Sequence, residues 1–91
     1  MYFVYILGCL HTRRTYVGHT DHLVRRFRMH GEGTTRTTRE KIQQPVILHF
    51  EILPTRAEAM RRERYFKQGA GYRRRMELAR IGFDAFNQSA G

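Results

Sequence analysis

The sequence has a single cysteine, little lysine and no long apolar run. With Cys9 alone an internal disulfide is impossible, and its place in an apolar stretch indicates a small buried side chain. No apolar segment approaches the ~18 residues of a membrane-spanning helix, and no segment resembles a signal peptide with its cleavage site. The histidines lack the paired-cysteine framework of a zinc site. We therefore expect a soluble, intracellular, cytoplasmic protein that is not associated with a membrane.

The chain is also short and poor in acidic residues. Its 91 residues leave room for one domain, which we place at residues 1–82, followed by a tail over residues 83–91. Seventeen basic residues stand against eight acidic ones, a formal net charge of +9 with the histidines neutral. Nearly all the basic residues are arginines, whose planar guanidinium matches phosphate oxygens in pairs. A polyanionic partner is the leading expectation.

Three segments have the composition of β-strands. Residues 2–7 are aromatic or aliphatic throughout, which predicts a central strand that is apolar on both faces. Residues 15–19 predict a second strand, and the short polar turn between the two favours an antiparallel hairpin. Residues 46–53 alternate with period two and predict a third strand with one firmly buried face, the one that carries Val46, Leu48, Phe50 and Ile52.

A helix is predicted after the second strand. Thr20 or Asp21 can accept hydrogen bonds from its first free amides, and the helix runs to about His30 and ends at Gly31. The following residues, 31–44, are almost free of apolar side chains and predict a mobile basic loop.

Two more helices are predicted after the third strand. The first covers about residues 56–68 and begins with a capping box formed by Thr55 and Glu58. The second is amphipathic, covers residues 72–81 and ends near Gly82. The predicted fold class is therefore α+β, a three-stranded antiparallel sheet flanked by helices.

Glu63 lies in the middle of the apolar face of the helix over residues 56–68. Burying an unpaired carboxylate is costly unless a cation answers its charge. Lys67, one turn further along in the favourable order, is one candidate for that cation. A divalent metal is the other, since Mg²⁺ is commonly held by one carboxylate together with water and substrate phosphate.

Four more side chains are candidates for the same site. Arg26 and His30 flank the inward stripe of the first helix, and Tyr5 and Tyr16 lie on neighbouring strands. Singly, each has an ordinary interpretation: an arginine whose stem covers apolar neighbours, a core histidine near a helix C-terminus, and two strand aromatics. We expect all four to converge with Glu63 on one side of the sheet, and this combination indicates a reaction site.

The spacing of these residues resembles that of the GIY-YIG nucleases, and more closely the small members that consist of little beyond the nuclease domain. Phe3-Val4-Tyr5 stands where the first family tripeptide falls, with Phe3 in place of its glycine, and Tyr16-Val17-Gly18 stands where the second falls. The similarity extends over roughly residues 2–80. It continues at the family's intervals with Thr20, Leu23, Arg26, His30, Arg62, Glu63 and Lys67.

The resemblance implies a mixed fold and metal-dependent hydrolysis of a phosphodiester bond in DNA. Glu63 would hold one Mg²⁺ or Mn²⁺, and Arg26 would hold the scissile phosphate and stabilise its transition state. Tyr16 would be the general base or would position the water. Tyr5 and His30 would orient Tyr16 or relay the proton.

We expect an endonuclease directed by the structure or damage of DNA more than by its sequence, because a chain of this length has no room for a second, DNA-reading domain. Any sequence specificity would come from the loop over residues 31–44 or from a protein partner. The alternative is a nucleic-acid-binding module of the same fold with weak or no catalysis. The residues expected to contact nucleic acid are Gly18, Arg25, Arg28, Arg36, Arg39, Lys41, Arg62 and Lys67.

Overall fold

Strand β1, Tyr2–Cys9, is the middle strand of a three-stranded antiparallel sheet. It pairs with β2, Thr15–Thr20, on one side and with β3, Pro45–Leu53, on the other, so that the order is β2-β1-β3. The structure is a computed structural model that describes residues 1–31 and 44–90. The last six residues of β1 are all buried, as expected for a central strand covered on both faces.

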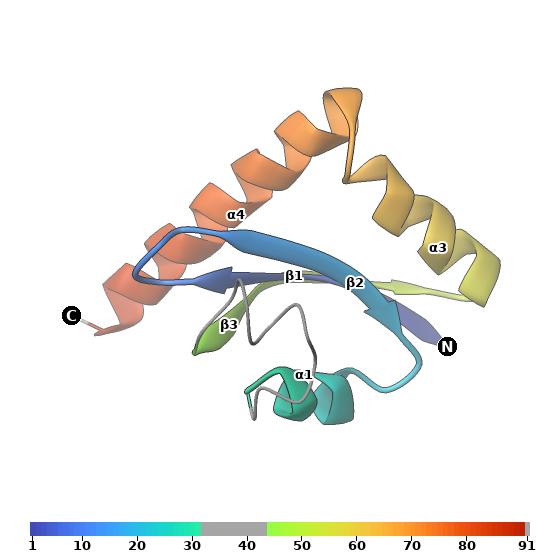
Figure 1. Cartoon of the computed structure of the whole chain (residues 1–91), viewed down its shortest axis with the longest axis horizontal. Coiled ribbons are helices and arrows are strands. Elements are labelled where there is room, and N and C mark those ends of the chain that lie inside the picture. Colours follow the sequence, from blue (N-terminus) through green and yellow to red (C-terminus); the bar gives the residue numbers. More distant parts are fainter. Residues whose placement is uncertain (32–43, 91) are drawn as a thin grey trace.

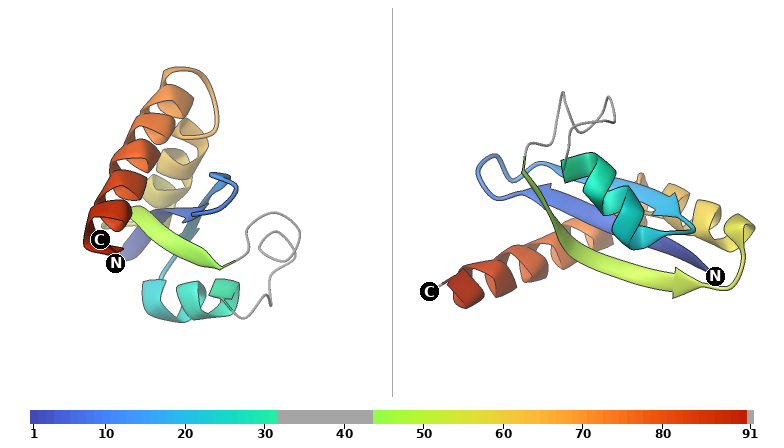
Figure 2. Two further views of the ribbon diagram at one scale, coloured as in Figure 1. Left: turned by 90° about the vertical axis from the view of Figure 1, so that its left-hand side faces the viewer. Right: turned by 90° about the horizontal axis from the view of Figure 1, so that it is seen from below.

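Helices cover both faces of this sheet (Figure 1). Helix α1, Leu23–Gly31, lies on one face, and helices α3, Arg56–Tyr65, and α4, Gly69–Ala90, lie on the other. Figure 2 shows the same arrangement from two further directions, with the sheet between α1 and the α3–α4 pair. The predicted α+β fold is therefore confirmed. None of the helices within the described ranges is long and apolar enough to cross a membrane.

The two faces of β1 contribute to two different buried groups. One face packs against α3 and forms a cluster made of Val4, Ile6, Val17, Ala59 and Phe66. The alternate residues Tyr5 and Leu7 point to the opposite face, where α1 brings in His30. The last residue of the strand, Cys9, is buried and forms no disulfide.

The first turn of α1 is capped by a residue that the sequence did not single out. The backbone N–H of Arg25 donates to Nδ1 of His22 at 3.2 Å. The hydroxyl of Thr20 accepts instead from the backbone N–H of His22, at 3.1 Å. The expectation of a cap at Thr20 or Asp21 was therefore wrong, because Thr20 serves the turn that precedes the helix.

The third strand contains one residue more than its partner, Leu48, between Ile47 and His49. Such a β-bulge reverses the facing of every residue beyond it. Phe50 and Ile52 are accordingly 49% and 55% exposed. The expected buried face was wrong for this half of the strand.

Helix α3 begins as the sequence predicts. The side-chain oxygen of Thr55 accepts a hydrogen bond from the backbone N–H of Glu58 at 3.2 Å. The helix ends at Tyr65, earlier than the expected Gln68. Gly69 then adopts a φ of 59°, which favours glycine, and the chain turns there into α4.

Helix α4 continues through Gly82, where a helix end was expected, and reaches Ala90. A Cβ atom at Gly82 would lie 2.6 Å from the backbone oxygen of Leu48 in β3. This glycine therefore permits a close approach between helix and strand and does not end the helix. Because the next residue, Phe83, is only 5% exposed, the boundary expected between residues 82 and 83 falls inside a packed helix.

Candidate active site

Tyr5 and Tyr16 lie on the face of the sheet that α1 covers. In the register of β1 with β2, Tyr5 is opposite Gly18 and Tyr16 is opposite Leu7, so the two tyrosines are diagonal neighbours. Their ring centroids are 6.3 Å apart. A Cβ atom at Gly18 would lie only 2.4 Å from the Tyr5 hydroxyl. The absence of a side chain at Gly18 therefore lets the Tyr5 ring extend across β2, the edge strand.

The hydroxyl of Tyr5 is hydrogen bonded to His30 of α1, with 3.0 Å between Oη and Nε2. Burial raises the pKa of Tyr5 to about 12. Burial, together with the nearby charge of Arg26, lowers the pKa of His30 to about 4. At neutral pH the phenol therefore keeps its proton and is hydrogen bonded to a neutral imidazole. Both residues are 1% exposed, so the pair lies in the interior and stabilises the positions of the residues packed around it.

Tyr16 differs from Tyr5 in being only half-buried. Its ring centroid lies 5.2 Å from that of His30. This contact with the buried imidazole holds the Tyr16 ring on its inner side. Over the described part of the chain, its hydroxyl has no hydrogen-bond partner. The Tyr16 hydroxyl is thus available to a substrate or a water molecule, whereas that of Tyr5 is already engaged.

Arg26, also from α1, lies close to these rings. Its charge helps to lower the pKa of His30, and its side chain, through hydrogen bonding and charge, opposes the rise in the pKa of Tyr5 that burial causes. Its Nε atom is buried and has no hydrogen-bond partner among the residues described. Leaving such a donor unsatisfied is costly, and a phosphate oxygen would satisfy it.

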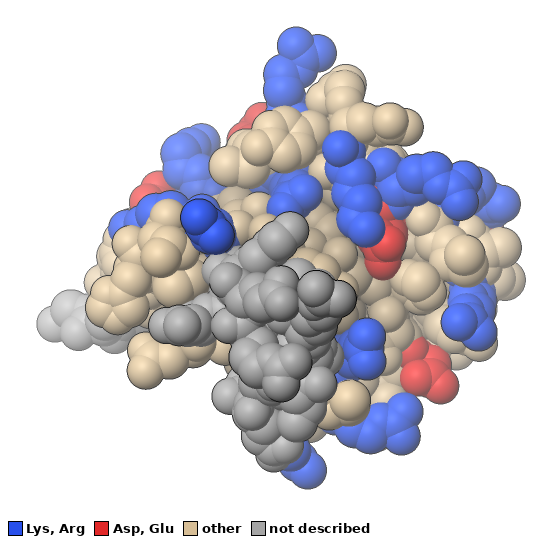
Figure 3. Space-filling model, viewed as in Figure 1, with Lys and Arg blue, Asp and Glu red and all other residues tan. Residues whose placement is uncertain are grey.

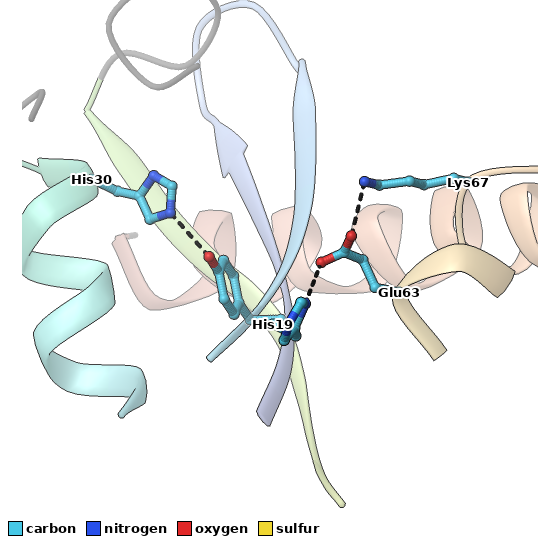
Figure 4. A network of polar contacts seen from close by, with 5 residues as sticks. His19, His30, Glu63 and Lys67 are labelled. Atoms are coloured by element: carbon cyan, nitrogen blue, oxygen red, sulfur yellow. Dashed lines mark hydrogen bonds and ion pairs between the residues drawn. The ribbon is translucent and has the colours of Figure 1, made fainter. Parts of the chain in front are cut away.

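Glu63 reaches the site from α3. Its Oε1 accepts a hydrogen bond from Nδ1 of His19 at 2.9 Å, and its Oε2 accepts one from Nζ of Lys67 at 3.0 Å (Figure 4). Burial acts to raise the pKa of Glu63, but the hydrogen bonds from His19 and Lys67 hold it below its usual value. The carboxylate is therefore ionised at neutral pH.

Of the two cations considered for Glu63, Lys67 is present as a partner, and His19 is a further partner that the sequence interpretation missed. The period-two alternation of β2 contained a signal for it. His19 shares a strand face with Val17, and that face is the one that α3 covers.

The five predicted residues do not all lie on one side of the sheet, so that expectation was wrong. Helix α1, which contains Arg26 and His30, lies on one face of the sheet, while α3, which contains Glu63, lies on the other (Figure 1). Figure 4 shows His30 and Glu63 on opposite sides of the strands. The two sets approach each other at β2. The charge of Glu63 contributes to the raised pKa of Tyr5, and His19 and Arg26 line one cavity. Among the strands that the structure describes, none lies beyond β2 in the sheet order, so groups from both faces can act on one substrate there.

The donor set around Glu63 fits a single Mg²⁺ or Mn²⁺ held by one carboxylate. Within residues 1–31 and 44–90, no three His, Cys, Asp or Glu side chains are grouped so as to hold an ion by themselves. Water and a substrate phosphate would complete the coordination shell, as they commonly do for Mg²⁺. The Lys67 side chain is 51% exposed, so it would be able to turn into solvent if an ion took its place on Glu63.

The residues expected to contact nucleic acid have contrasting environments. Arg25 and Arg28 are exposed on α1, and Arg25 lies 3.7 Å from Asp21. The guanidinium of Arg62 is instead bound by Glu51 at 2.8 and 3.2 Å, away from the two tyrosines. Figure 3, in the same view as Figure 1, shows Lys and Arg side chains spread over this side of the molecule. Three of the expected contacts lie outside the described residues: Arg36, Arg39 and Lys41.

A small α+β fold that brings an arginine, a free phenol and an ionised carboxylate to one sheet edge is suited to phosphodiester chemistry. The family model of the GIY-YIG catalytic domain matches residues 1–75. The chain therefore belongs to the GIY-YIG family, which confirms the resemblance drawn from the sequence and indicates a nuclease. Neither a search of curated proteins nor a search of solved structures found a match.

Proposed function

We propose that this protein is a metal-dependent endonuclease that hydrolyses phosphodiester bonds in DNA. One observation carries the proposal: three groups with complementary chemistry lie around the edge strand β2. Among the residues that the structure describes, the Nε–H of Arg26 is buried without a partner and the Tyr16 hydroxyl is free, while Glu63 offers an ionised carboxylate. Family membership supports the same class of activity.

Arg26 would donate to a non-bridging oxygen of the scissile phosphate. The negative charge on these oxygens grows as the attacking oxygen approaches, so a fixed guanidinium binds the transition state more tightly than the ground state. Tyr16 would position the attacking water, or would take its proton while passing the phenol proton to solvent. The Tyr5–His30 pair would keep the Tyr16 ring in place from the interior.

Glu63 would hold the single Mg²⁺ or Mn²⁺. When bound, such an ion polarises a phosphate oxygen and lowers the pKa of water. His19 would keep the Glu63 carboxylate in place through its 2.9 Å bond, while Lys67 would give up its bond to the other oxygen.

The choice of substrate would depend on the structure or damage of the DNA. The exposed arginines of α1 suit contacts with phosphates, which are the same in every sequence and therefore fix position without reading bases. We place the protein inside the cell with its DNA substrate, in a role connected with DNA repair. A protein partner would supply any further specificity.

A nucleic-acid-binding module without turnover is the second candidate. The observation that favours it is that both Glu63 oxygens already have partners, His19 and Lys67, as in a purely structural ion pair.

Nicking of supercoiled plasmid across a titration of Mg²⁺ and Mn²⁺ tests the proposal and separates the two candidates. Wild-type protein should nick only with a divalent ion, and Glu63→Gln should abolish nicking while DNA binding stays equal or becomes slightly tighter. Glu77→Gln, on the exposed face of α4, is the matched control because it removes one carboxylate away from the site. Nicking retained by Glu63→Gln would defeat the metal assignment. Wild-type protein that binds DNA but cuts no substrate with any ion would favour the binding module.

A further inference from the structure

We propose that a cavity at the end of β2 binds one unpaired nucleotide of the substrate strand, next to the phosphate that is cut. This inference rests on the proposed function and adds the form of DNA that the site accepts. The cavity has a volume of about 400 Å³.

The cavity is formed where three elements begin or end, beside helix α1. Tyr2 is the first residue of β1, Thr20 is the last of β2, and Arg56 is the first of α3. Helix α1 contributes further lining residues, among them Arg26. Because Arg26 and His19 also belong to the proposed active site, an occupant of this cavity would be adjacent to the scissile phosphate.

The size of the cavity favours a single nucleotide. Small-molecule sites typically measure about 300–1,000 Å³, and this cavity is at the lower end of that range. A paired and stacked base inside a duplex cannot enter a cavity of this kind, so an occupant must be unpaired or extruded from the helix.

The charge of the lining favours an anionic ligand. Three guanidinium groups, those of Arg25, Arg26 and Arg56, stand against the single carboxylate of Asp21. Asp21 is 65% exposed and lies 3.7 Å from Arg25, so it neutralises one of the three at most. The remaining positive charge suits the phosphates on either side of a nucleotide.

The lining also includes a surface for a base. The Tyr2 ring is only partly buried, and Met29 adds a second apolar side chain. Bases of unpaired strands are commonly held by stacking on aromatic rings or guanidinium planes. Phosphate-binding arginines beside a partly exposed tyrosine are therefore the combination that a single-stranded segment requires. The expected substrates are single strands, flaps and sites with an extruded base, in preference to intact duplex.

Equilibrium binding in EDTA tests this proposal, because no cleavage takes place without a divalent ion. A labelled oligonucleotide is measured as a single strand and as a duplex, with wild-type protein and three variants. Arg56→Ala and Tyr2→Leu alter the cavity, and Leu keeps the apolar packing of Tyr2 while removing its flat ring. Arg61→Ala is the matched control, since it removes an exposed arginine of the same helix that does not line the cavity.

We expect wild-type protein to bind the single strand about tenfold or more tightly than the duplex, the size of one base-stacking contact. Arg56→Ala and Tyr2→Leu should remove most of this preference, whereas Arg61→Ala should weaken both forms equally. Equal binding of both forms by wild-type protein would overturn the proposal, as would cavity variants that behave like Arg61→Ala. If Tyr2→Leu melts early, Arg56→Ala, at an exposed position, decides the outcome.

This outcome is independent of the nicking test. A protein that never cuts plasmid can still show the single-strand preference. Conversely, a protein that cuts plasmid but binds both forms equally retains the proposed function and loses the nucleotide site.

Discussion

The Nδ1 atom of His19 donates a hydrogen bond to Oε1 of Glu63 across 2.9 Å, and this bond joins the edge strand to α3. Both side chains are 22% exposed, whereas Lys67, which binds the other oxygen, is 51% exposed. The hydrogen bond from His19 is therefore better shielded from solvent than the one from Lys67. Partners of this kind orient a metal ligand without touching the metal.

Replacement of His19 tests this orienting role. His19→Ala should lower the nicking rate by about 10–100-fold and raise the Mg²⁺ concentration needed for half-maximal rate, because the Glu63 carboxylate loses its fixed orientation. His19→Asn places an amide donor near the position of Nδ1 and should restore much of the rate. Nicking rates measured over a Mg²⁺ titration provide both quantities. Equal losses in the Ala and Asn variants would contradict a role through this hydrogen bond.

Arg26→Lys distinguishes a guanidinium that binds phosphate from one that merely packs. Lysine keeps the charge and most of the stem but loses the planar, two-pronged donor. If Arg26 stabilises the transition state, the rate should fall by about 10²-fold or more, by analogy with other removed transition-state donors. Arg28→Lys, at an exposed position of the same helix, is the matched control. Near-normal nicking by Arg26→Lys would remove this residue from the site.

Tyr16→Phe should affect catalysis and leave stability nearly unchanged. The hydroxyl that it removes has no hydrogen-bond partner within residues 1–31 and 44–90, so the free energy of unfolding should change by less than about 1 kcal/mol. The nicking rate should nevertheless fall by about 10²-fold or more if this hydroxyl takes a proton or positions the water. Urea unfolding and plasmid nicking on one preparation measure both effects.

Tyr5→Phe should show the reverse pattern. It removes the hydrogen-bond partner of Nε2 of the buried His30, which should cost about 1–3 kcal/mol of unfolding free energy. Its nicking rate at a temperature where it is fully folded should fall less than that of Tyr16→Phe. Identical behaviour of the two variants would contradict the division of roles between the two tyrosines.

Local pattern was sufficient to predict most of the fold. The apolar run of residues 2–7 predicted the central strand, and the short polar turn after it predicted the hairpin that brings Tyr5 and Tyr16 together. The cap at Thr55 was predicted because its partner, Glu58, is only three residues away. These features depend on contacts between residues close in the sequence.

Features that depend on distant contacts were not predicted. The extra residue of the β-bulge, Leu48, is of a type common in strands, so nothing in the sequence distinguishes it from its neighbours. Gly82 resembles a helix terminator, and only its contact with β3 shows another role. The pairing of His19 with Glu63 spans 44 positions and depends on the face of the sheet on which α3 packs. Strand periodicity shows which residues share a face with His19, but it does not show which face α3 covers.

The buried histidine of α1 makes stability depend on pH. Folding lowers the pKa of His30 from 6.5 to about 4, because burial and the charge of Arg26 disfavour the imidazolium. Between these two values the unfolded chain binds a proton at His30 and the folded chain does not. The stability contributed by the neutral imidazole is therefore complete above pH 6.5 and is lost as the pH falls to about 4. The loss should amount to about 3 kcal/mol.

His30→Gln isolates this contribution, since the glutamine amide can still hydrogen bond to the Tyr5 hydroxyl but does not titrate. Urea unfolding across the acidic range should give a steeper decline for wild-type protein than for the variant, with the difference developing between pH 6.5 and about 4. Glu51 and Glu63, whose pKa values folding lowers below 4.5, contribute a further decline at lower pH in both proteins. That decline cancels from the comparison because both carboxylates are present in wild type and variant alike. Parallel curves would mean that the folded protein accommodates a charged His30, and the neutral state assigned to this imidazole would then be wrong.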